Sequence, residues 1–431
     1  TVREDGFLVE AGHNGWLDRE PAARALLREL GLEGSRIEAR PASRHRFIVR
    51  GGRLCRVPDS PPALLTSPAL SPAGRLRLLL EPFAPGPPAV GEETVFEFAR
   101  RRIGEDAAEH LVDAAISGIS AGDSRRLSVR AAFPLMVEME REHGSLIRAM
   151  IARRRTGPAR LASLDRGLGL LVETLARALG DRLHTSAAVV RVRPTGRTFR
   201  VTVGDGEELE AEHVVLALPA WCAARIVEPI EPALARDLDA VPAAGLAVVA
   251  LALRREDVAH PLEGYGHLVT RGEGRDTLGV VWESSLFDGR APAGTVLLRA
   301  MLGGTRRPHC VEMDPQALEA RAREEMSPLL GLRGEPLKRW VFRWPRAIPQ
   351  YERGHLERLE RMRNVVGRFP GLELCGSSHD GVALASAIAS ADQVVTRLLA
   401  GGADVRGEAG LPATAEAAGG GVAEPAGGRP A

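Results

Sequence analysis

The spacing of apolar residues divides the first part of the chain into a strand, a helix and a hairpin. Residues 6–10 have the pattern of a strand, and residues 21–30 have helical spacing, with a proline at the start and a glycine just beyond the end. Residues 46–50 and 53–57 are alternating apolar runs separated by two glycines. We therefore predict a β-hairpin over residues 46–57.

The pattern changes after Pro58, where a proline-rich stretch gives way to segments of helical periodicity. These segments are 97–103, 107–116 and 129–140. We interpret residues 58 to about 160 as a helical insert.

Strand patterns return in the second half of the chain. The predicted helices are 170–179, 315–330 and 382–399, and the predicted strands are 189–192, 199–203, 214–218, several between 246 and 302, and 372–375. Beyond Gly402 the sequence consists mainly of Gly, Ala, Pro and Glu. Such a composition cannot bury enough surface to offset its ordering entropy, so residues 403–431 are predicted to be disordered.

The composition is that of a soluble globular protein without a large charge imbalance. The 431 residues are 44% apolar and 26% charged, and 57 basic against 56 acidic side chains leave a formal charge of +1. A charge so close to zero, with only 4% aromatic residues, argues against nucleic acid as a partner. Such binding needs a basic footprint and stacking platforms.

The four cysteines stand far apart and form no motif for zinc or for a disulfide scaffold. We therefore predict no metal site and a reducing, cytoplasmic setting. No run approaches the roughly 18 apolar residues that span a bilayer, so a membrane contact would be peripheral.

Three segments have residues suited to binding a ligand. Residues 376–381 place small residues between a strand and a helix, where backbone N–H groups and the helix dipole can face a phosphate or an anionic reduced flavin. An ordinary strand-to-helix turn explains the same pattern. Residues 165–169 form a second glycine-bearing start of a helix, and residues 44–46 offer cations for a carboxylate. No Ser/His/Asp or Cys/His arrangement can be assembled, so hydrolytic catalysis has no support.

Several motifs, in order along the chain, carry a resemblance to a known family. They are residues 5–12 (DGFLVEAG), 118–123 (GISAGD) with Leu127-Ser128 and Phe133-Pro134, 139–145 (MEREHGS), and 344–351 (WPRAIPQY) with 354–356 (GHL). From residue 6 to about residue 400 the chain resembles the oxygen-dependent protoporphyrinogen oxidases, which are flavin enzymes of haem biosynthesis in the amine oxidase superfamily.

The resemblance implies a fold of α/β and α+β parts: an incomplete Rossmann-like FAD domain built from separated segments, an antiparallel-sheet substrate domain, and a helical membrane-associating insert. The implied regions are the start of the substrate domain (1–57), the insert (58–160), an FAD-binding segment (161–218), the rest of the substrate domain (219–350), a C-terminal FAD-binding segment (351–402) and the tail (403–431).

The implied activity is the oxidation of protoporphyrinogen IX to protoporphyrin IX with FAD and oxygen, which gives hydrogen peroxide. The cofactor carries the redox chemistry, so no catalytic side chain is expected. Arg46 corresponds to a propionate-binding arginine, and the other implied substrate-side residues are Gly118, Ile119, Ala121 and Gly122. The implied FAD-binding positions are Gly12, Gly167, Leu168, Val189, Pro219, Trp344, Gly376, His379, Gly381, Val382 and Ala383.

The chain departs from the family pattern at several positions. Members begin with a strand, a GxGxxG turn and a helix that hold the ADP half of FAD, and this segment is missing before Thr1, so we expect the sequence to be a fragment. The family usually has Gly where Arg166 stands and Pro where His13 stands, and it has Tyr and Gly in place of His379 and Ala383. Arg166 adds bulk where the backbone would approach FAD closely.

Two other functions stay open at this point. One is oxidation of coproporphyrinogen to coproporphyrin by the same mechanism, and the other is a flavin-free pseudoenzyme that binds a porphyrin or a protein partner. The expected partners are a porphyrinogen, oxygen, the inner face of the cell membrane and a second copy of the chain. An apolar helical stripe buries as readily against protein as against lipid.

Overall fold

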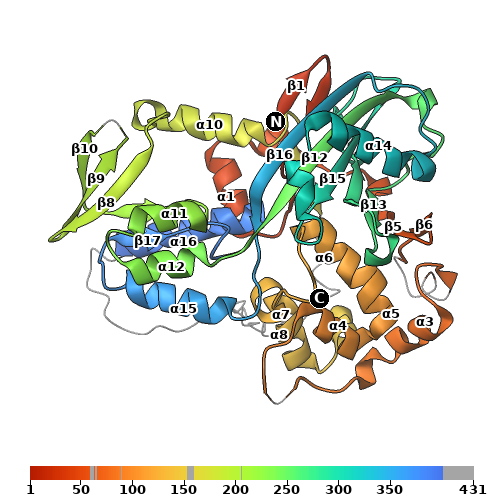
Figure 1. Cartoon of the computed structure of the whole chain (residues 1–431), viewed down its shortest axis with the longest axis horizontal. Helices are drawn as coiled ribbons and strands as arrows, with labels where there is room; N and C mark the ends of the chain where they lie inside the picture. The colour runs from red at the N-terminus through yellow and green to blue at the C-terminus, as the bar shows by residue number, and fades with distance from the viewer. Residues whose placement is uncertain (59–62, 64–65, 89, 153–159, 205, 401–431) are drawn as a thin grey trace, which may run out of the picture.

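The computed structural model describes residues 1–58, 63, 66–88, 90–152, 160–204 and 206–400. Two lobes that contain sheets lie side by side along the long axis, and a group of helices lies below one of them (Figure 1). The tail that we predict to be disordered, 403–431, lies outside the described residues.

A seven-stranded sheet forms the centre of one lobe. Its strand order is β16–β12–β15–β14–β13–β5–β6, and all neighbours are antiparallel except β13 and β5. The strands are β5 (Arg46–Arg50), β6 (Arg53–Arg56), β12 (Ala243–Arg254), β13 (Gly266–Val269), β14 (Thr277–Trp282), β15 (Thr295–Gly303) and β16 (Lys338–Pro349). The predicted hairpin is confirmed as β5–β6, and both glycines of its turn have positive φ.

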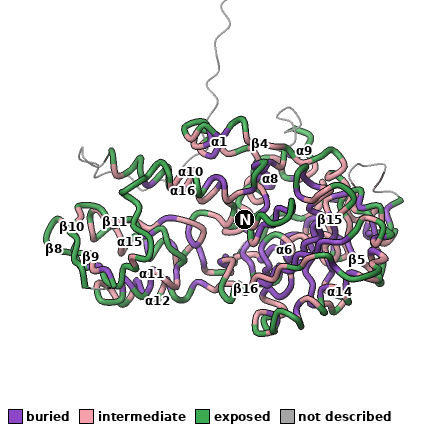
Figure 2. Tube along the Cα trace, turned by 90° about the horizontal axis from the view of Figure 1, so that it is seen from above, coloured by how far each residue is buried: buried purple, intermediate pink, exposed green. Residues whose placement is uncertain are grey.

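The central strands of this sheet pack against α14 (Pro315–Leu330). β12 is an almost continuous apolar run, and nearly all of it is buried. Leu251, Trp282 and Leu298 of the sheet share one apolar cluster with Leu318 and Met326 of the helix. Buried positions accordingly gather around β15 in Figure 2. Removal of this apolar surface from water stabilises the lobe.

The other lobe contains a parallel pair of strands, β11 (Val214–Leu216) and β17 (Leu372–Leu374), from distant parts of the chain. Four helices lie beside the pair in Figure 1: α11 (Ala220–Val227), α12 (Pro232–Asp239), α15 (His355–Val366) and α16 (Leu384–Ala400). An antiparallel sheet of β8 (Val189–Thr195), β9 (Thr198–Val203) and β10 (Glu208–Ala211) projects from this lobe.

A small antiparallel sheet, β3–β7–β4, joins the start of the chain to its middle. It consists of β3 (Trp16–Leu17), β4 (Arg36–Glu38) and β7 (Leu161–Leu164), and the hairpin β1 (Val2–Glu4)–β2 (Phe7–Val9) precedes it. Residues of α1 (Pro21–Glu29), α10 (Gly169–Leu179) and α16 pack with this sheet in one cluster. The first 57 residues thus contribute strands to three different sheets, and the predicted domain boundaries stay predictions.

Residues 72–152 form the helices of the insert. They are α3 (Pro72–Leu79), α4 (Val95–Ile103), α5 (Glu105–Ala107), a π-helical turn at Ala108–Val112, α6 (Asp113–Ser120), α7 (Val129–Ala132), α8 (Pro134–His143) and α9 (Leu146–Ala152). The single helix predicted over 129–140 is wrong, because Phe133 has non-helical φ and ψ of −138° and 57° and Pro134 starts a new helix. Among the described helices, none combines the length and the hydropathy needed to cross a bilayer.

The sequence pattern predicts neither β16 nor α15. β16 carries exposed arginines and tryptophan, and its alternation is therefore weak. Its pairing with β12 along nearly its whole length makes it a strand. The C-terminal strand and helix that were predicted, at 372–375 and 382–399, are present as β17 and α16.

Candidate active site

The loops that follow β11 and β17 lie at the same edge of the parallel pair. β11 leads through Pro219 into α11, and β17 leads through residues 375–383 into α16. The backbone N–H of Ala220 donates to the Ser378 Oγ at 3.0 Å, which ties the two loops together. Open α/β sheets bind ligands outside the carboxyl ends of their parallel strands. Pro219 and the loop 376–383 therefore form one candidate binding edge.

The glycines of this loop have backbone conformations that other residues rarely adopt. The φ of Gly376 is +107° and that of Gly381 is +118°. A Cβ on Gly376 would have no atom within 4 Å, whereas one on Gly381 would lie 2.8 Å from the Ser386 Cβ. Gly376 thus faces open space through which a ligand can approach the backbone, while Gly381 allows close packing on α16.

His379 brings an unpaired buried nitrogen to the same loop. Its side chain is 7% exposed, and its Nε2 has no hydrogen-bond partner. Burial lowers the pKa of the imidazole, although Asp380 opposes the shift, so the ring is neutral at pH 7. Buried polar atoms are normally paired, and a bound ligand would supply the missing partner. Val382 and Ala383 follow immediately, before α16 begins.

The loop after β2 lies against this edge. The His13 side chain is hydrogen-bonded to the backbone of Val382. The Trp344 Nε1 of β16 donates to the Ala11 carbonyl at 3.0 Å, and a Cβ on Gly12 would contact nothing within 4 Å. The structure thus brings the predicted positions Gly12, Trp344 and Val382 together.

A buried ion pair that the sequence analysis missed fixes Gly12. The Arg299 Nε lies 2.6 Å from the Glu283 Oε1, and its NH1 donates to the Gly12 carbonyl at 2.8 Å. The two side chains are 4% and 2% exposed. Each charge interrupts an apolar run, and a buried charge needs a partner. A charge within an apolar run is therefore the feature of the sequence that could have revealed this ion pair.

The same carboxylate is connected to the predicted propionate-binding arginine. The Asn14 Nδ2 donates to the Glu283 Oε1 at 3.3 Å, and the Asn14 side chain is also hydrogen-bonded to the Tyr265 hydroxyl. Burial, with Glu283 next in size, raises the pKa of this hydroxyl, so it stays protonated. The Arg46 guanidinium lies 5.7 Å from the centre of the Tyr265 ring. Contacts thus run from Gly12 to Arg46.

The other predicted substrate-side residues gather where α6 packs on the seven-stranded sheet. A Cβ on Gly118 would lie 2.2 Å from the Leu268 Cδ2 of β13, so a larger residue at this position would displace the Leu268 side chain. Ala121 ends α6 in the left-handed conformation, and Ile119 is 62% exposed. β13 is also the neighbour of β5, which carries Arg46. The substrate-side residues are therefore collected around one strand.

Three predicted FAD-binding positions lie elsewhere. The Leu168 backbone N–H donates to the Glu10 Oε1 at 2.7 Å, and a Cβ on Gly167, whose φ is +79°, would lie 2.7 Å from the same oxygen. Gly167 and Leu168 therefore pack against Glu10, the residue that follows β2. Val189 begins β8 and is 38% exposed, and among the described contacts none links it to the other positions.

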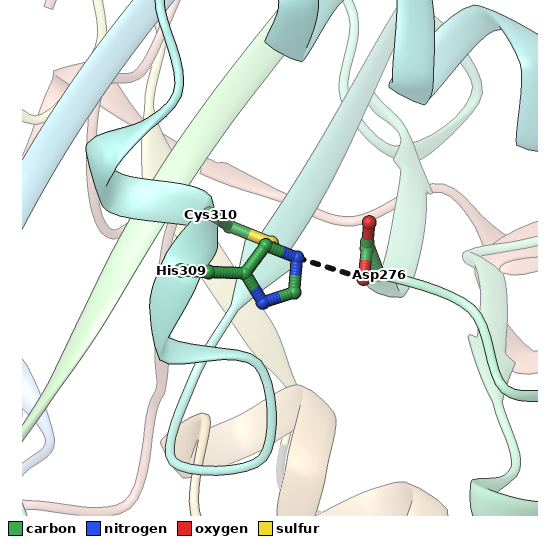
Figure 3. Close-up of side chains that lie close together, drawn as sticks. All are labelled: Asp276, His309 and Cys310. Atoms are coloured by element: carbon green, nitrogen blue, oxygen red, sulfur yellow. Dashed lines mark hydrogen bonds and ion pairs between the residues drawn. The ribbon is translucent and has the colours of Figure 1, made fainter.

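One group of potential metal ligands occurs among the described residues: Asp276, His309 and Cys310 (Figure 3). The His309 Nε2 lies 3.4 Å from the Asp276 Oδ1, and Asp276 also pairs with Arg307 and Arg321, each at 3.6 Å. Burial raises the pKa of the Cys310 thiol to about 12, so the thiolate that a metal needs is disfavoured. Ion pairing accounts for the contact between Asp276 and His309.

The comparison with known protein families covers nearly the whole chain. Residues 1–399 match the family described as flavin containing amine oxidoreductase. The chain belongs to this family. It is therefore a flavin-dependent oxidoreductase, and a mixed α/β fold is what the structure contains.

Two relatives in this flavin family match nearly the whole chain. Coproporphyrinogen III oxidase of Bacillus subtilis is 26% identical over 405 residues, which cover 90% of this chain and 86% of the relative. Protoporphyrinogen oxidase of Homo sapiens is 33% identical over 441 residues, which cover 92% of this chain and 88% of the relative.

A solved structure supports the fold of this flavin oxidoreductase. It is the crystal structure of a protein of Exiguobacterium sp. 255-15 assigned as a protoporphyrinogen oxidase. Its TM-score is 0.80 with 23% sequence identity, and the match covers 92% of this chain and 89% of that chain. At this identity the likeness concerns the fold alone.

Proposed function

We propose that the protein is an FAD-dependent porphyrinogen oxidase of haem biosynthesis, with protoporphyrinogen IX as substrate. The observation that carries the proposal is the meeting of two groups of residues: backbone positions open to a ligand at Gly12 and Gly376, and a substrate-side group that contains Arg46. The relatives named for porphyrinogen oxidation support the same conclusion.

The residues at the binding edge fit an FAD molecule. Gly12 and Gly376 leave room beside the backbone, and the neutral His379 has an unpaired Nε2. The N-terminal end of α16 follows the loop and favours negative charge. We assign β11, β17 and their flanking helices to a Rossmann-like FAD domain built from separated segments. Bound flavin would supply the two-electron redox chemistry.

The side chains of the protein would bind and orient the porphyrinogen. The Arg46 guanidinium would pair with a propionate, and the exposed Ile119 would contact the apolar macrocycle. Six hydrogen atoms leave protoporphyrinogen IX to give protoporphyrin IX, and three O2 take them up as three H2O2. No side chain has to form a covalent bond in this reaction, which is consistent with the absence of a catalytic triad from the described site.

The direct test is to supply the protein with FAD and with protoporphyrinogen IX in air. We expect stoichiometric flavin in the visible spectrum, fluorescence of the porphyrin product, and hydrogen peroxide in the ratio of three to each porphyrin. Absence of flavin binding together with absence of peroxide above the rate of spontaneous oxidation would overturn the proposal.

Coproporphyrinogen III is the second candidate substrate, favoured by two observations. The Bacillus subtilis relative is named for it, and Arg44 and His45 stand beside Arg46 at the start of β5. Coproporphyrinogen carries four propionates, whereas protoporphyrinogen carries two, so an additional cation such as Arg44 would favour coproporphyrinogen. The ratio of kcat/KM for the two porphyrinogens decides between them, and we expect the larger value for protoporphyrinogen.

We further propose that the insert contacts the inner face of the cell membrane. α3 and the turn after it expose four apolar side chains within eight residues: Leu76 (60%), Leu79, Leu80 and Phe83 (80%). Co-sedimentation with anionic lipid vesicles tests this contact. We expect Leu76→Ser with Phe83→Ser to abolish it and Leu209→Ser, at an exposed position of β10, to leave it intact. A vesicle-independent dimer in sedimentation velocity would instead indicate a second copy on this face.

A further inference from the structure

The five residues after β16, 350–354, connect the two halves of the candidate active site, and we call them the strap. In Figure 1 the chain leaves β16 and passes beside α7 to reach α15. Residues 350 and 351 are Gln and Tyr, both almost completely buried at 1% and 6% exposure. Buried polar groups are normally paired, and the Gln350 Nε2 and the Tyr351 hydroxyl find their partners on opposite halves of the site.

Gln350 contacts the substrate-side segment. Its Nε2 donates to the Ser120 carbonyl at 2.9 Å and to the Ile348 carbonyl at 2.9 Å. A Cβ on Gly122 would lie 2.4 Å from the Gln350 Oε1, so this side chain lies directly against the segment. Gln350 therefore fixes the end of α6 relative to β16.

Tyr351 contacts the loop at the candidate flavin edge. Its hydroxyl donates to the Ser377 carbonyl at 2.5 Å and accepts from the Gly381 N–H at 2.8 Å. Its ring stacks on the buried His355 with centroids 4.1 Å apart and planes 11° from parallel. One hydroxyl thus joins both ends of the segment 377–381, in which Gly381 has a positive φ.

The strap is also attached to the insert through its backbone and its charges. The Tyr351 carbonyl accepts from the Ser128 N–H at 2.8 Å, and the Gly354 N–H donates to the Glu92 Oε2 at 2.9 Å. Glu352 pairs with Arg126 at 3.0 Å. The backbone and charges of the strap therefore bind it to the insert, and the Tyr351 side chain extends from there to the loop 377–381.

We propose that Gln350 and Tyr351 are positioning residues that set the separation of the porphyrinogen and the flavin. This inference rests on the proposed function. Successive Cα atoms are about 3.8 Å apart, so two neighbouring residues that each hold one half of the site allow little independent movement. Hydride removal needs reacting atoms within about 3.5 Å, and the contacts of Gln350 and Tyr351 with the two halves of the site would maintain such a separation.

The first test is Tyr351→Phe, which removes both hydrogen bonds to the loop and keeps the stacked ring. We expect the Kd for FAD, measured by fluorescence titration, to rise about tenfold, the equivalent of one net hydrogen bond to a buried site. The visible flavin band should change shape because the loop beside it relaxes. The KM for the porphyrinogen should stay within about twofold.

The second test is Gln350→Met, which keeps the length of the side chain and removes the donor to Ser120. We expect the opposite result to that of Tyr351→Phe. The KM for the porphyrinogen should rise about fivefold to tenfold, while the Kd for FAD should stay within about twofold. The control for Tyr351→Phe is Thr195→Val, which also removes a hydroxyl but lies at an exposed turn of the β8–β9 hairpin. It should change neither the Kd for FAD nor the KM for the porphyrinogen.

The proposal is overturned if Tyr351→Phe binds FAD as the natural protein does, or if both variants change Kd and KM together. Should either variant be less stable, the FAD-dependent rise in its melting temperature, compared with its own flavin-free value, still reports the affinity. A natural protein that binds no FAD and oxidises no porphyrinogen refutes the proposed function instead, so the two failures are distinguishable.

Discussion

Arg299 and Glu283 form an ion pair in the interior of the protein, with Nε and Oε1 2.6 Å apart and side chains no more than 4% exposed. The same guanidinium donates to the Gly12 carbonyl. One side chain therefore neutralises a buried carboxylate and also fixes a backbone position at the candidate flavin site. Both the stability of the protein and its affinity for FAD should therefore depend on Arg299.

Arg299→Met should lower the apparent free energy of unfolding by about 3–5 kcal/mol, because it leaves Glu283 buried without a partner. Urea denaturation measures this loss. Arg361→Met is the matched control, since Arg361 pairs with Asp237 at 2.6 Å but is 56% exposed, and its effect should be about 1 kcal/mol or less.

A second variant separates the two roles of Arg299. In Arg299→Met with Glu283→Gln the unpaired charge is gone, so part of the lost stability should return. Flavin affinity should stay low, because the Gly12 carbonyl still lacks its donor. Equal losses of stability for Arg299→Met and Arg361→Met would contradict the importance of the buried pair.

Arg46→Ala should raise KM for the porphyrinogen about 10- to 100-fold and change kcat much less. A propionate contact is present in both the ground state and the transition state, and a charge-assisted hydrogen bond is worth about 1.5–3 kcal/mol. Arg53→Ala, at the other end of the same hairpin, should behave like the natural protein. Unchanged steady-state kinetics for Arg46→Ala would exclude it from the substrate site.

Gly376→Ala should weaken FAD binding about tenfold or more. Its Cβ would occupy open space that we assign to the cofactor, and its φ of +107° adds strain of about 1–2 kcal/mol. Gly196→Ala is the control, because Gly196 has a φ of +75° with open space around it in the β8–β9 turn. If both variants lose stability and both keep their flavin, the cofactor does not approach Gly376.

The protein should lose stability as the pH falls below about 6.5. Burial lowers the pKa of His267 and of His355 to about 3. The unfolded chain binds protons at these histidines near pH 6.5 and the folded chain does not, so each costs about 2 kcal/mol by pH 5. The stability that depends on the two neutral histidines is fully present above pH 6.5 and is lost progressively as the pH falls towards 3.

Urea unfolding at pH 7.5 and pH 5 measures the effect. In His267→Leu the difference between the two pH values should shrink by about 2 kcal/mol. The exposed His184 serves as control, and His184→Leu should leave the difference unchanged. A difference that His267→Leu does not alter would show that this imidazole is protonated in the folded protein.

Local pattern predicts the regular elements of this fold well where neighbours along the chain decide the structure. The hairpin of β5 and β6, the amphipathic helix α14 and the strand–loop–helix that contains Gly376 are all visible in the sequence. The helix predicted over 129–140 is wrong at Phe133. β16 was missed because its strand conformation depends on pairing with β12.

The residues of the candidate site also fall into two groups, those that the sequence indicates and those that only the structure reveals. Gly376 and Gly381 can be recognised from the sequence because a turn between a strand and a helix has a local signature, whereas Gly12 is implied only by the family resemblance. The buried pair of Glu283 with Arg299 and the contacts of Gln350 and Tyr351 could not be recognised. Each joins segments that are distant along the chain.

The sequence by itself determined the periodic helices and strands, the turn chemistry and the resemblance to a flavin family. The tertiary structure alone decided which charge meets which carboxylate and which strand lies beside which. The physical reason is that backbone conformation depends mainly on adjacent residues, whereas desolvation makes a buried polar group take a partner from whatever element the fold brings into contact.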